Sequence, residues 1–316
     1  MKKLALILLA LGVTLALMIA CTPTLGPTAT PTPTPTPIQI TDDHGRTVSI
    51  VETPQRIVSL APSATEILFA LGLGDKVVGV TDYCDYPPEL LDKINATEIQ
   101  RVGSYFPGFN LETIVALEPD VAFAIGATVP DYVNDLEGLG IAAVVLNAKD
   151  IDGIFHDIEL VGEVTGKDAE AEALTTDLKE QIDEIVATVA NASIPSIFYG
   201  SDVSDPSALW TAGNGTFIDA FITMAGGENI AGGVEGWTTF SLEVLIDYNP
   251  DIIVLGGALW GVSAEEVSGR AGWQDLDAVK SGNIFAIDDT LLVRPGPRIA
   301  DGLDLLAGLI HPELFD

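Results

Sequence analysis

A short block of sequence occurs twice in this chain, and this repeat constrains the fold more than any other feature. Residues 110–127 read NLETIVALEPDVAFAIGA, and residues 241–258 read SLEVLIDYNPDIIVLGGA. Both blocks carry a Leu-Glu pair, a Pro-Asp pair and a Gly-Ala pair at the same steps. The distance along the chain from one block to the other is far longer than the period of about 20–50 residues that marks a solenoid. The repeat therefore predicts two lobes built on one plan, with a cleft between them.

Alternating apolar runs and helical patterns predict an α/β fold. We expect strands at 56–60, 77–81, 120–125, 141–147, 196–200, 251–256 and 283–287. Near-continuous apolar strands of this kind are typical of a parallel sheet that is covered on both faces. We expect helices at 63–71, after Asn110, near 216–225, near 242–248 and at about 297–309. Ser63 and Glu66 have the spacing of a capping box, so Ser63 is predicted to cap the first of these helices.

A long amphipathic helix is expected from Lys167 to Ala190. Its apolar residues step by three or four positions, at Leu174, Leu178, Ile182, Ile185 and Val189. Because this helix stands between the two repeats, we interpret it as the connector of the lobes. The predicted domain plan is a signal peptide at 1–20, a lipidated tether at 21–38, an N-terminal lobe at 39–166, the connecting helix at 167–192 and a C-terminal lobe at 193–316.

The first residues have the pattern of a secretory signal. Lys2 and Lys3 precede an apolar run at 4–20, which ends at Cys21 after a small residue. This order predicts cleavage and lipid attachment at Cys21, and an uncleaved membrane anchor is the alternative. Residues 22–38 are rich in alternating Thr and Pro, a composition that favours an extended polyproline tether. We therefore expect an extracytoplasmic protein that is lipid-anchored to a membrane.

Net charge and cysteine usage narrow the class of partner. The chain has 14 basic and 46 acidic residues, which gives a formal net charge of −32. Such a field repels nucleic acid and anionic lipid headgroups, so nucleic-acid binding is excluded. With Cys21 lipidated only Cys84 is left, and an intrachain disulfide is impossible. Cys84 is either a thiol at a cleft rim or a small buried apolar residue.

Patterns of catalytic and metal-binding residues are weak. The sequence has neither a G-x-S-x-G elbow nor an H-E-x-x-H motif, and the glycine-rich stretch 226–233 lacks a P-loop lysine and is interpreted as a turn. His44, His156 and His311 lack the spacing of metal ligands, so we expect no bare metal site. We expect no enzyme activity. A secreted α/β hydrolase and a structural or adhesive lipoprotein are the alternatives from other classes.

Five segments of the chain resemble a known family. They read RIVSLAPSATEILFALG, GVTDYCDYPPE, FNLETIVALEPD, TFSLEVLIDYNPD and RPGPR. The chain from about residue 38 onward resembles the class III substrate-binding proteins of ABC importers, which serve vitamin B12, iron-siderophores and haem. The resemblance implies two Rossmann-like lobes joined by one long helix, with the ligand between them and small closure. It also implies a monomer that delivers its ligand to a permease dimer and its ATPase.

The resemblance is greatest to the cobalamin-binding members, and it implies a set of ligand-binding residues. Phe106 and Trp237 stand at two positions that commonly carry tryptophan facing the corrin. Tyr83 matches a cleft tyrosine, and Arg294 matches an arginine near the ligand. Further candidates are Tyr105, beside Phe106, and Trp260, in a glycine-rich loop. Ordinary core packing is the alternative for each aromatic residue.

Glu112 and Glu243 occupy the same step of the two repeats. A carboxylate in the first turn of a helix is stabilised by the helix dipole, which is one explanation for both residues. The resemblance implies another explanation, in which each lobe presents one glutamate to an arginine of a permease subunit. Two equivalent carboxylates suit a partner with two-fold symmetry.

The ligand implied by the resemblance is a corrinoid, and a ferric siderophore or haem is the alternative. No cofactor is expected apart from that ligand. Few basic residues flank the predicted cleft beyond Arg294 and Arg298, which disfavours highly anionic complexes. Arg298 has a second interpretation, as the residue that begins the last helix.

Overall fold

The computed structural model of this chain describes residues 37–126 and 129–315. The predicted signal peptide, the lipid attachment at Cys21 and most of the Thr-Pro tether lie outside the described residues, so they stay predictions. Within the described ranges, no helix is both long and apolar enough to cross a membrane.

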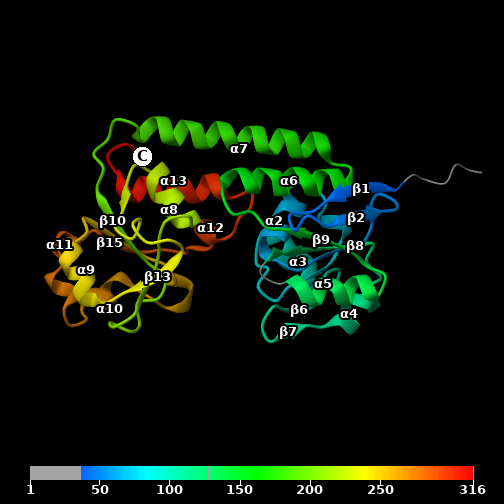
Figure 1. The fold of residues 1–316 in the computed structure, drawn as a ribbon, viewed down its shortest axis with the longest axis horizontal. Coiled ribbons are helices and arrows are strands. Elements are labelled where there is room, and N and C mark those ends of the chain that lie inside the picture. The colour runs from blue at the N-terminus through cyan, green and yellow to red at the C-terminus, as the bar shows by residue number, and fades with distance from the viewer. Residues whose placement is uncertain (1–36, 127–128, 316) are drawn as a thin grey trace, which may run out of the picture. The chain divides into compact units, whose positions relative to one another are not determined.

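The N-terminal lobe is built on a five-stranded sheet with the order β5-β4-β3-β8-β9 (Figure 1). Its strands are β3 Ile57–Ser59, β4 Val77–Val80, β5 Gln100–Arg101, β8 Val121–Ile125 and β9 Ala142–Leu146. Every neighbouring pair is parallel, as the continuous apolar runs predict. Two antiparallel hairpins accompany this sheet, β1 Ile38–Thr41 with β2 Thr47–Ile50, and β6 Gly103–Ser104 with β7 Gly108–Phe109.

The C-terminal lobe repeats the plan with a four-stranded sheet in the order β12-β10-β14-β15. Its strands are β10 Ser196–Gly200, β12 Glu228–Asn229, β14 Ile252–Leu255 and β15 Ile284–Ala286, and all of them pair in parallel. An antiparallel pair, β11 Leu209–Ala212 with β13 Trp237–Phe240, lies beside it. The expected turn at 226–233 is therefore wrong in part, because an edge strand, β12, lies within it.

Helices cover both sheets. In the N-terminal lobe they are α2 Pro62–Ala70, α3 Pro88–Asn95, α4 Leu111–Ala116, α5 Val129–Gly138 and α6 Ile151–Thr165, with the 3-10 turn η1 Gly74–Lys76. In the C-terminal lobe they are α8 Phe217–Met224, α9 Leu242–Tyr248, α10 Ala264–Ser268, α11 Asp277–Ser281, α12 Thr290–Val293 and α13 Ile299–Ile310, with the 3-10 turns η3 Ala258–Trp260 and η4 Trp273–Asp275.

The long helix α7, Asp168–Val189, packs on α6 of the first lobe and on α13 of the second (Figure 1). Its buried side chains include Leu178, Ile182, Ile185 and Val189, which the sequence periodicity predicts. They belong to one buried apolar cluster that continues into both lobes. Burying each such side chain stabilises the fold by about 1.5–3 kcal/mol, so α7 ties the two sheets to a common core.

The two repeated blocks fold in the same way. In each, a short capped helix leads into a central strand, α4 into β8 and α9 into β14. The repeated aspartates have equivalent partners. Asp120 Oδ2 accepts a hydrogen bond from the backbone N–H of Arg56 at 2.8 Å, and Asp251 Oδ2 accepts one from the N–H of Ser196 at 2.8 Å. Each carboxylate thus ties its own strand to the beginning of the neighbouring strand in its sheet.

The start of α2 differs from the prediction. Pro62 occupies the first turn, Ala61 is the N-cap residue without a side-chain hydrogen bond, and Ser63 lies buried inside the helix. Proline suits this position because its fixed φ matches the helix and its missing N–H is not needed there. The capping-box prediction for Ser63 and Glu66 is therefore wrong, and the Glu66 side chain has different partners.

Glu66 is a buried carboxylate that binds two arginines of the other lobe. It lies on α2 and is only 2% exposed. Arg298, at the start of α13, donates from Nε to Oε2 at 2.8 Å and from Nη2 to Oε1 at 2.7 Å. Arg294 donates from Nη1 to Oε1 at 3.2 Å. We call Glu66, Arg294 and Arg298 the inter-lobe ion cluster, because its carboxylate and its guanidinium groups come from different lobes.

The inter-lobe ion cluster extends to two residues after β4. Arg294 also binds the Asp85 carboxylate, with Nη1 and Oδ1 separated by 2.6 Å, and the Arg298 guanidinium lies 4.1 Å from the ring centroid of Tyr86. Burial opposes the charge of both arginines, but the hydrogen bonds and negative charge of their carboxylate partners outweigh it, so the pKa of each lies above its ordinary value. Arg298 therefore begins the last helix and also binds across the lobes.

On the N-terminal lobe, two neighbouring carboxyl groups, Asp157 and Asp43, share a site in which one of them has a raised pKa. Asp157, on α6, is buried, and its Oδ2 accepts the N–H of Ala148 at 3.2 Å. Asp43, in the β1–β2 turn, accepts the N–H of Asn147 at 2.6 Å. Burial and the neighbouring Asp43 carboxylate raise the pKa of Asp157 to about 9, so Asp157 carries a proton at neutral pH.

We predict that Glu66→Gln lowers the free energy of unfolding by about 2–4 kcal/mol, because two partly buried arginines lose their shared counter-charge. Urea unfolding of residues 37–316, followed by circular dichroism, measures this change. The control is Lys280→Gln, which breaks the exposed pair between Lys280 Nζ and Asp277 Oδ1 at 2.9 Å and is expected to cost less than about 1 kcal/mol. Equal losses in the two variants would show that the cluster contributes no more than a surface pair.

We also predict that Asp157→Asn stabilises the protein at alkaline pH. The folded state holds the Asp157 proton up to about pH 9, whereas the ordinary value is 3.8, so stability falls as pH rises between these limits. Asparagine keeps a donor at this place and removes the loss, so Tm at pH 8 is expected to rise by about 2–6 °C.

The gain from Asp157→Asn is expected to shrink towards pH 3, below the ordinary value of 3.8, where the wild-type carboxyl is protonated in the unfolded state as well as in the folded one. Scanning calorimetry across this pH range measures it, with Asp152→Asn, an exposed carboxylate on the same helix, as the control. A pH profile of Asp157→Asn that parallels the wild type would contradict the buried proton.

Candidate functional site

The four aromatic residues with the most specific predictions are all exposed. Tyr83 is 55% exposed, Tyr105 57%, Phe106 79% and Trp237 49%. Core packing, the alternative for each of them, is therefore wrong. An exposed ring is available to a ligand or a partner, which a ring buried in the core is not.

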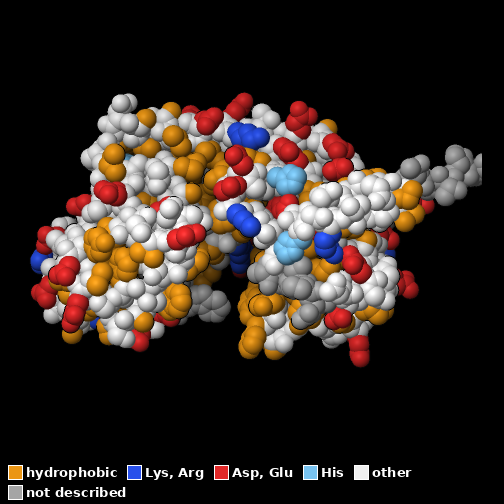
Figure 2. Space-filling model, in the orientation of Figure 1, with side chains coloured by type: hydrophobic (Ala, Val, Ile, Leu, Met, Phe, Trp, Pro, Cys, Tyr) orange, Lys and Arg blue, Asp and Glu red, His pale blue; other side chains and the backbone are white. Residues whose placement is uncertain are grey.

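Trp237 lies in a pocket to which both lobes contribute. The pocket has a volume of about 370 Å³. From the C-terminal lobe it is lined by Gly215, Thr216, Phe217, Ile218, Gly236, Trp237, Leu292 and Val293, and from the N-terminal lobe by Lys149. Figure 2 shows the molecular surface hollowed between the two lobes. The walls are mostly apolar, which is typical of sites that hold the flat face of an organic ligand.

The ring of the buried residue Tyr199 packs edge to face against the indole of Trp237. The ring centroids of Tyr199 and Trp237 are 6.3 Å apart, with an interplanar angle of 65°. Tyr199, on β10, donates its hydroxyl to Asp289 Oδ2 at 2.6 Å. Burial, reinforced by the charge of Asp289, raises the pKa of Tyr199, so the hydroxyl keeps its proton and remains a donor. The orientation of Trp237 is thus supported by a rigid part of the sheet.

Tyr105 and Phe106 occupy the turn between β6 and β7 on the other lobe. Ser104 Oγ donates to the carbonyl oxygen of Phe106 at 2.8 Å, which fixes this turn. The ring pairs found among the described residues do not join either aromatic to Trp237. Phe109, which follows in β7, packs instead in the core against Tyr132. The structure therefore brings the predicted aromatics to exposed positions on both lobes without placing them in contact.

The other ligand-binding candidates have mixed outcomes. Arg294 lies at the lobe junction, but its guanidinium is bound to Glu66 and Asp85, and its hydrogen bond to the Asp85 carboxylate holds the pKa of that group below its ordinary value. Trp260 ends the turn η3, and its side chain lies outside the described part of the structure. Ligand contact by either residue stays a prediction.

Glu112 and Glu243 have matching surroundings. Each is the second residue of a short helix, α4 or α9, and each is exposed. Asn110 Oδ1 caps the first helix by accepting the N–H of Thr113, and Ser241 Oγ caps the second by accepting that of Val244. Because the caps already satisfy a backbone donor in each first turn, the two carboxylates project from equivalent, ordered positions.

Cys84 is buried and bound to two threonines. Its sulfur lies 3.1 Å from Thr65 Oγ1 and 3.2 Å from Thr81 Oγ1. Burial raises the pKa of the Cys84 thiol, so it stays protonated and weakly nucleophilic at neutral pH. Of the two interpretations, the buried one is correct. In the described ranges, no cluster of three or more His, Cys, Asp or Glu side chains has the arrangement of a metal site.

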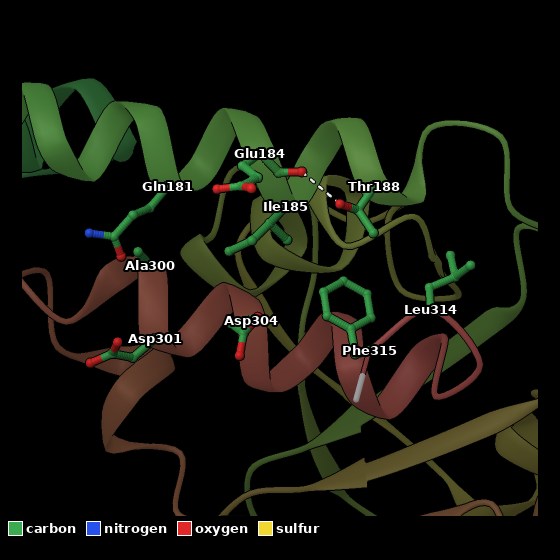
Figure 3. Close-up of a pocket in the computed structure, with 9 residues that line it drawn as sticks. All are labelled: Gln181, Glu184, Ile185, Thr188, Ala300, Asp301, Asp304, Leu314 and Phe315. Atoms are coloured by element: carbon green, nitrogen blue, oxygen red, sulfur yellow. Dashed lines mark hydrogen bonds between the residues drawn. The ribbon is translucent and has the colours of Figure 1, made fainter.

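A second hollow lies between α7 and α13. It has a volume of about 440 Å³ and is lined by Gln181, Glu184, Ile185, Thr188, Ala300, Asp301, Asp304, Leu314 and Phe315 (Figure 3). Its carboxylates belong to the acidic surface of the whole chain, and the residues that line it do not include any predicted site residue. We therefore place the candidate site at the pocket beside Trp237.

Sequence reasoning missed Glu66, Asp85 and Lys149. A single acid within the apolar run EILFALG was one available signal for Glu66, since a lone charge on a buried helix requires a partner. Arg294 and Arg298, four positions apart in the segment RPGPR, were the matching signal. Lys149 has no signal in the sequence, because only the fold places it opposite Trp237.

Comparison with known proteins agrees with this geometry. The family model described as periplasmic binding protein matches residues 57–291. The chain is 33% identical over 285 residues to an uncharacterised ABC transporter substrate-binding lipoprotein of Bacillus subtilis, a match that covers 88% of this chain and 87% of the relative. It is 29% identical over 287 residues to a cobalamin-binding protein of Halobacterium salinarum, with 85% and 73% of the two chains covered.

Solved structures share the fold over nearly their whole length. The periplasmic vitamin B12 binding protein of Vibrio cholerae aligns with a TM-score of 0.68 and 27% identity, covering 82% of this chain and 98% of that one. The periplasmic heme-binding protein from Roseiflexus sp., in its apo form, aligns with a TM-score of 0.72 and 26% identity, covering 82% and 99%. Two Rossmann-like lobes joined by one long helix, an inter-lobe pocket and the family match lead to one conclusion: the chain belongs to the periplasmic binding protein family.

Proposed function

We propose that this protein is an extracytoplasmic, lipid-anchored receptor that captures a corrinoid and delivers it to the permease of an ABC importer. The observation that carries the proposal is the half-exposed ring of Trp237 in an apolar pocket between the lobes. A corrin ring is large, flat and partly apolar, and stacking on an indole removes much of its face from water. The cobalamin-binding and vitamin B12 binding relatives support this ligand class.

The charge of the cleft supports a ligand with few negative groups. Arg294 and Arg298, the arginines that bind across the lobe junction, already have Glu66 and Asp85 as counter-charges. A highly anionic ferric siderophore would have to compete with these carboxylates in a chain of net charge −32. Haem, with two carboxylates, is the second candidate, and the heme-binding structural relative supports it.

The lipid anchor, the permease dimer with its ATPase, and the monomeric state are parts of the same proposal. The relative of Bacillus subtilis, named as an ABC transporter substrate-binding lipoprotein, supports the first two. A receptor of this kind binds and releases its ligand without altering it, so we propose no catalytic role.

Calorimetric titration of residues 37–316 with cyanocobalamin, dicyanocobinamide, haem and a ferric hydroxamate tests the proposed ligand. We expect one-to-one binding of the corrinoids. Binding of haem or the hydroxamate alone would keep the receptor function and change the ligand to an iron complex. If none of the four ligands binds, the receptor proposal is contradicted.

We predict that Trp237→Ala weakens corrinoid binding about tenfold to a hundredfold, because the stacking surface of the pocket is lost. The titration is repeated with the variant and with Tyr248→Ala, which removes an exposed aromatic residue of the same lobe that does not line the pocket. An unchanged Kd in Trp237→Ala, or an equal loss in both variants, would remove Trp237 from the site.

We predict that the double charge reversal Glu112→Lys/Glu243→Lys abolishes uptake and leaves the corrinoid Kd unchanged. The reason is that the two glutamates would meet arginines of the permease and lie outside the ligand pocket. Uptake of labelled cyanocobalamin by cells that carry the variant, together with titration of the purified protein, measures both effects.

The matched control for this experiment is Glu163→Lys/Glu228→Lys, which reverses one exposed glutamate on each lobe away from the repeated helices. Uptake is expected to survive in the control. A loss of ligand affinity in Glu112→Lys/Glu243→Lys, or normal uptake, would contradict the docking role.

A further inference from the structure

The pocket beside Trp237 contains one charged side chain. Of the described residues that line it, Lys149 alone is ionised, and it is also the one that comes from the N-terminal lobe. It follows the edge strand β9 and precedes the long helix α6, so its backbone is held between two regular elements. The lysine therefore faces the apolar wall that Trp237, Phe217 and Val293 form on the other lobe.

Lys149 differs from the arginines of the lobe junction in having no counter-charge of its own. Arg294 and Arg298 bind Glu66 and Asp85, whereas the ion pairs within residues 37–126 and 129–315 do not include Lys149. Its neighbour Asp150 is engaged elsewhere, since Asp150 Oδ1 accepts the N–H of Gly153 at 2.8 Å and caps α6.

A second positive feature meets the same pocket from the C-terminal lobe. Gly215, Thr216, Phe217 and Ile218 line it, and they form the beginning of α8. The first N–H groups of a helix have no intrahelical acceptor and carry a partial positive charge. The Thr216 side chain caps one of these groups, because its Oγ1 accepts the N–H of Asp219 at 3.2 Å. The first-turn acid Asp219 accepts a hydrogen bond from Asn229 Nδ2 at 2.8 Å, which lessens its opposition to an anion.

We propose, building on the receptor function proposed above, that Lys149 and the start of α8 bind an anionic oxygen group at the edge of the ligand whose ring stacks on Trp237. A phosphate ester or a carboxylate supplies the same chemistry, two or more oxygen acceptors that carry negative charge. In a chain of net charge −32, such a group is repelled everywhere except where an unpaired cation offsets the field.

The proposal defines a ligand class more closely than ring size does. The ligand has a flat apolar body and one anionic group that projects beyond its edge, and the lysine supplies selectivity between close relatives of equal ring area. Lys149 comes from one lobe while α8 and Trp237 come from the other, so the anionic group would also bridge the lobes.

Two pairs of probes differ in this group. Dicyanocobinamide and its phosphate ester share a corrin and differ in a phosphate, and haem and its dimethyl ester share a porphyrin and differ in two carboxylate charges. Each probe is titrated into residues 37–316 of the wild type, of Lys149→Met and of Lys280→Met, an exposed lysine of the C-terminal lobe that does not line the pocket. Methionine keeps the apolar stem of the lysine and removes its charge.

We expect Lys149→Met to weaken the anionic member of a pair roughly fivefold to thirtyfold and to leave the uncharged member within about twofold. The preference of the wild type for the anionic member is expected to shrink at high salt. A loss confined to the phosphate ester identifies a phosphate ligand, and a loss confined to haem identifies a carboxylate. Thermal unfolding of Lys149→Met confirms that the variant is folded.

If the wild type binds but Lys149→Met weakens both members of every pair equally, or weakens neither, the role of Lys149 is contradicted. The receptor function would stand in that case. A wild-type protein that binds none of the four probes would contradict this inference, and one that also fails to bind cyanocobalamin and the ferric hydroxamate would contradict the receptor function.

Discussion

The buried carboxylate of Glu66 is the interaction on which the arrangement of the lobes depends. An ionised carboxylate that is 2% exposed is costly unless it is paired and hydrogen-bonded. Its partners are Arg294 and Arg298, which reach α2 from the far end of the chain. The last segment must therefore return to the first lobe, and the two lobes cannot separate without leaving four charges unpaired, those of Glu66, Asp85, Arg294 and Arg298.

A second tie, α7, joins the same two lobes through apolar contacts. Leu178, Ile182 and Ile185 belong to a cluster that continues into both sheets, so a hinge motion would have to disturb a common core. Two ties of different chemistry, one ionic and one apolar, leave the pocket beside Trp237 largely preformed. Binding to a preformed apolar pocket avoids much of the ordering cost that a flexible site carries.

The ion pairs of Glu66 and Asp85 with Arg294 and Arg298 also determine the net charge at the lobe junction. Because Glu66 and Asp85 neutralise the two arginines, the junction contributes little net charge to a ligand. Lys149 and the start of α8 are then the positive features of the pocket. Ring stacking and one local charge, with no cluster of cations, are what this site offers to a ligand.

Local patterns in the sequence were sufficient for most of the fold. The strands β8 and β10, the connecting helix α7 and the cap of α4 by Asn110 follow from apolar runs, periodicity and a capping residue, all of which act within a few positions. The repeated block also predicts the equivalent helices α4 and α9 that carry Glu112 and Glu243.

Contacts between distant parts of the chain were not predictable in this way. Ser63 and Glu66 match a capping box locally, but Pro62 begins the helix and the long-range attraction of Arg298 determines where the Glu66 carboxylate points. The position of Lys149 opposite Trp237 depends on how the lobes meet. Sequence motifs therefore pointed to Trp237, which lines the pocket, whereas the charges around the pocket required the structure.

Hydrogen exchange of residues 37–316, with and without cyanocobalamin, tests most directly whether the ligand binds between preset lobes. The account predicts protection of the segments that carry the site, 104–109, 147–150, 215–218 and 236–240, with little change in α7 and in the two sheets. Protection centred on the groove between α7 and α13 would contradict the placement of the site. A broad change throughout α7 and both sheets would contradict the preset lobes.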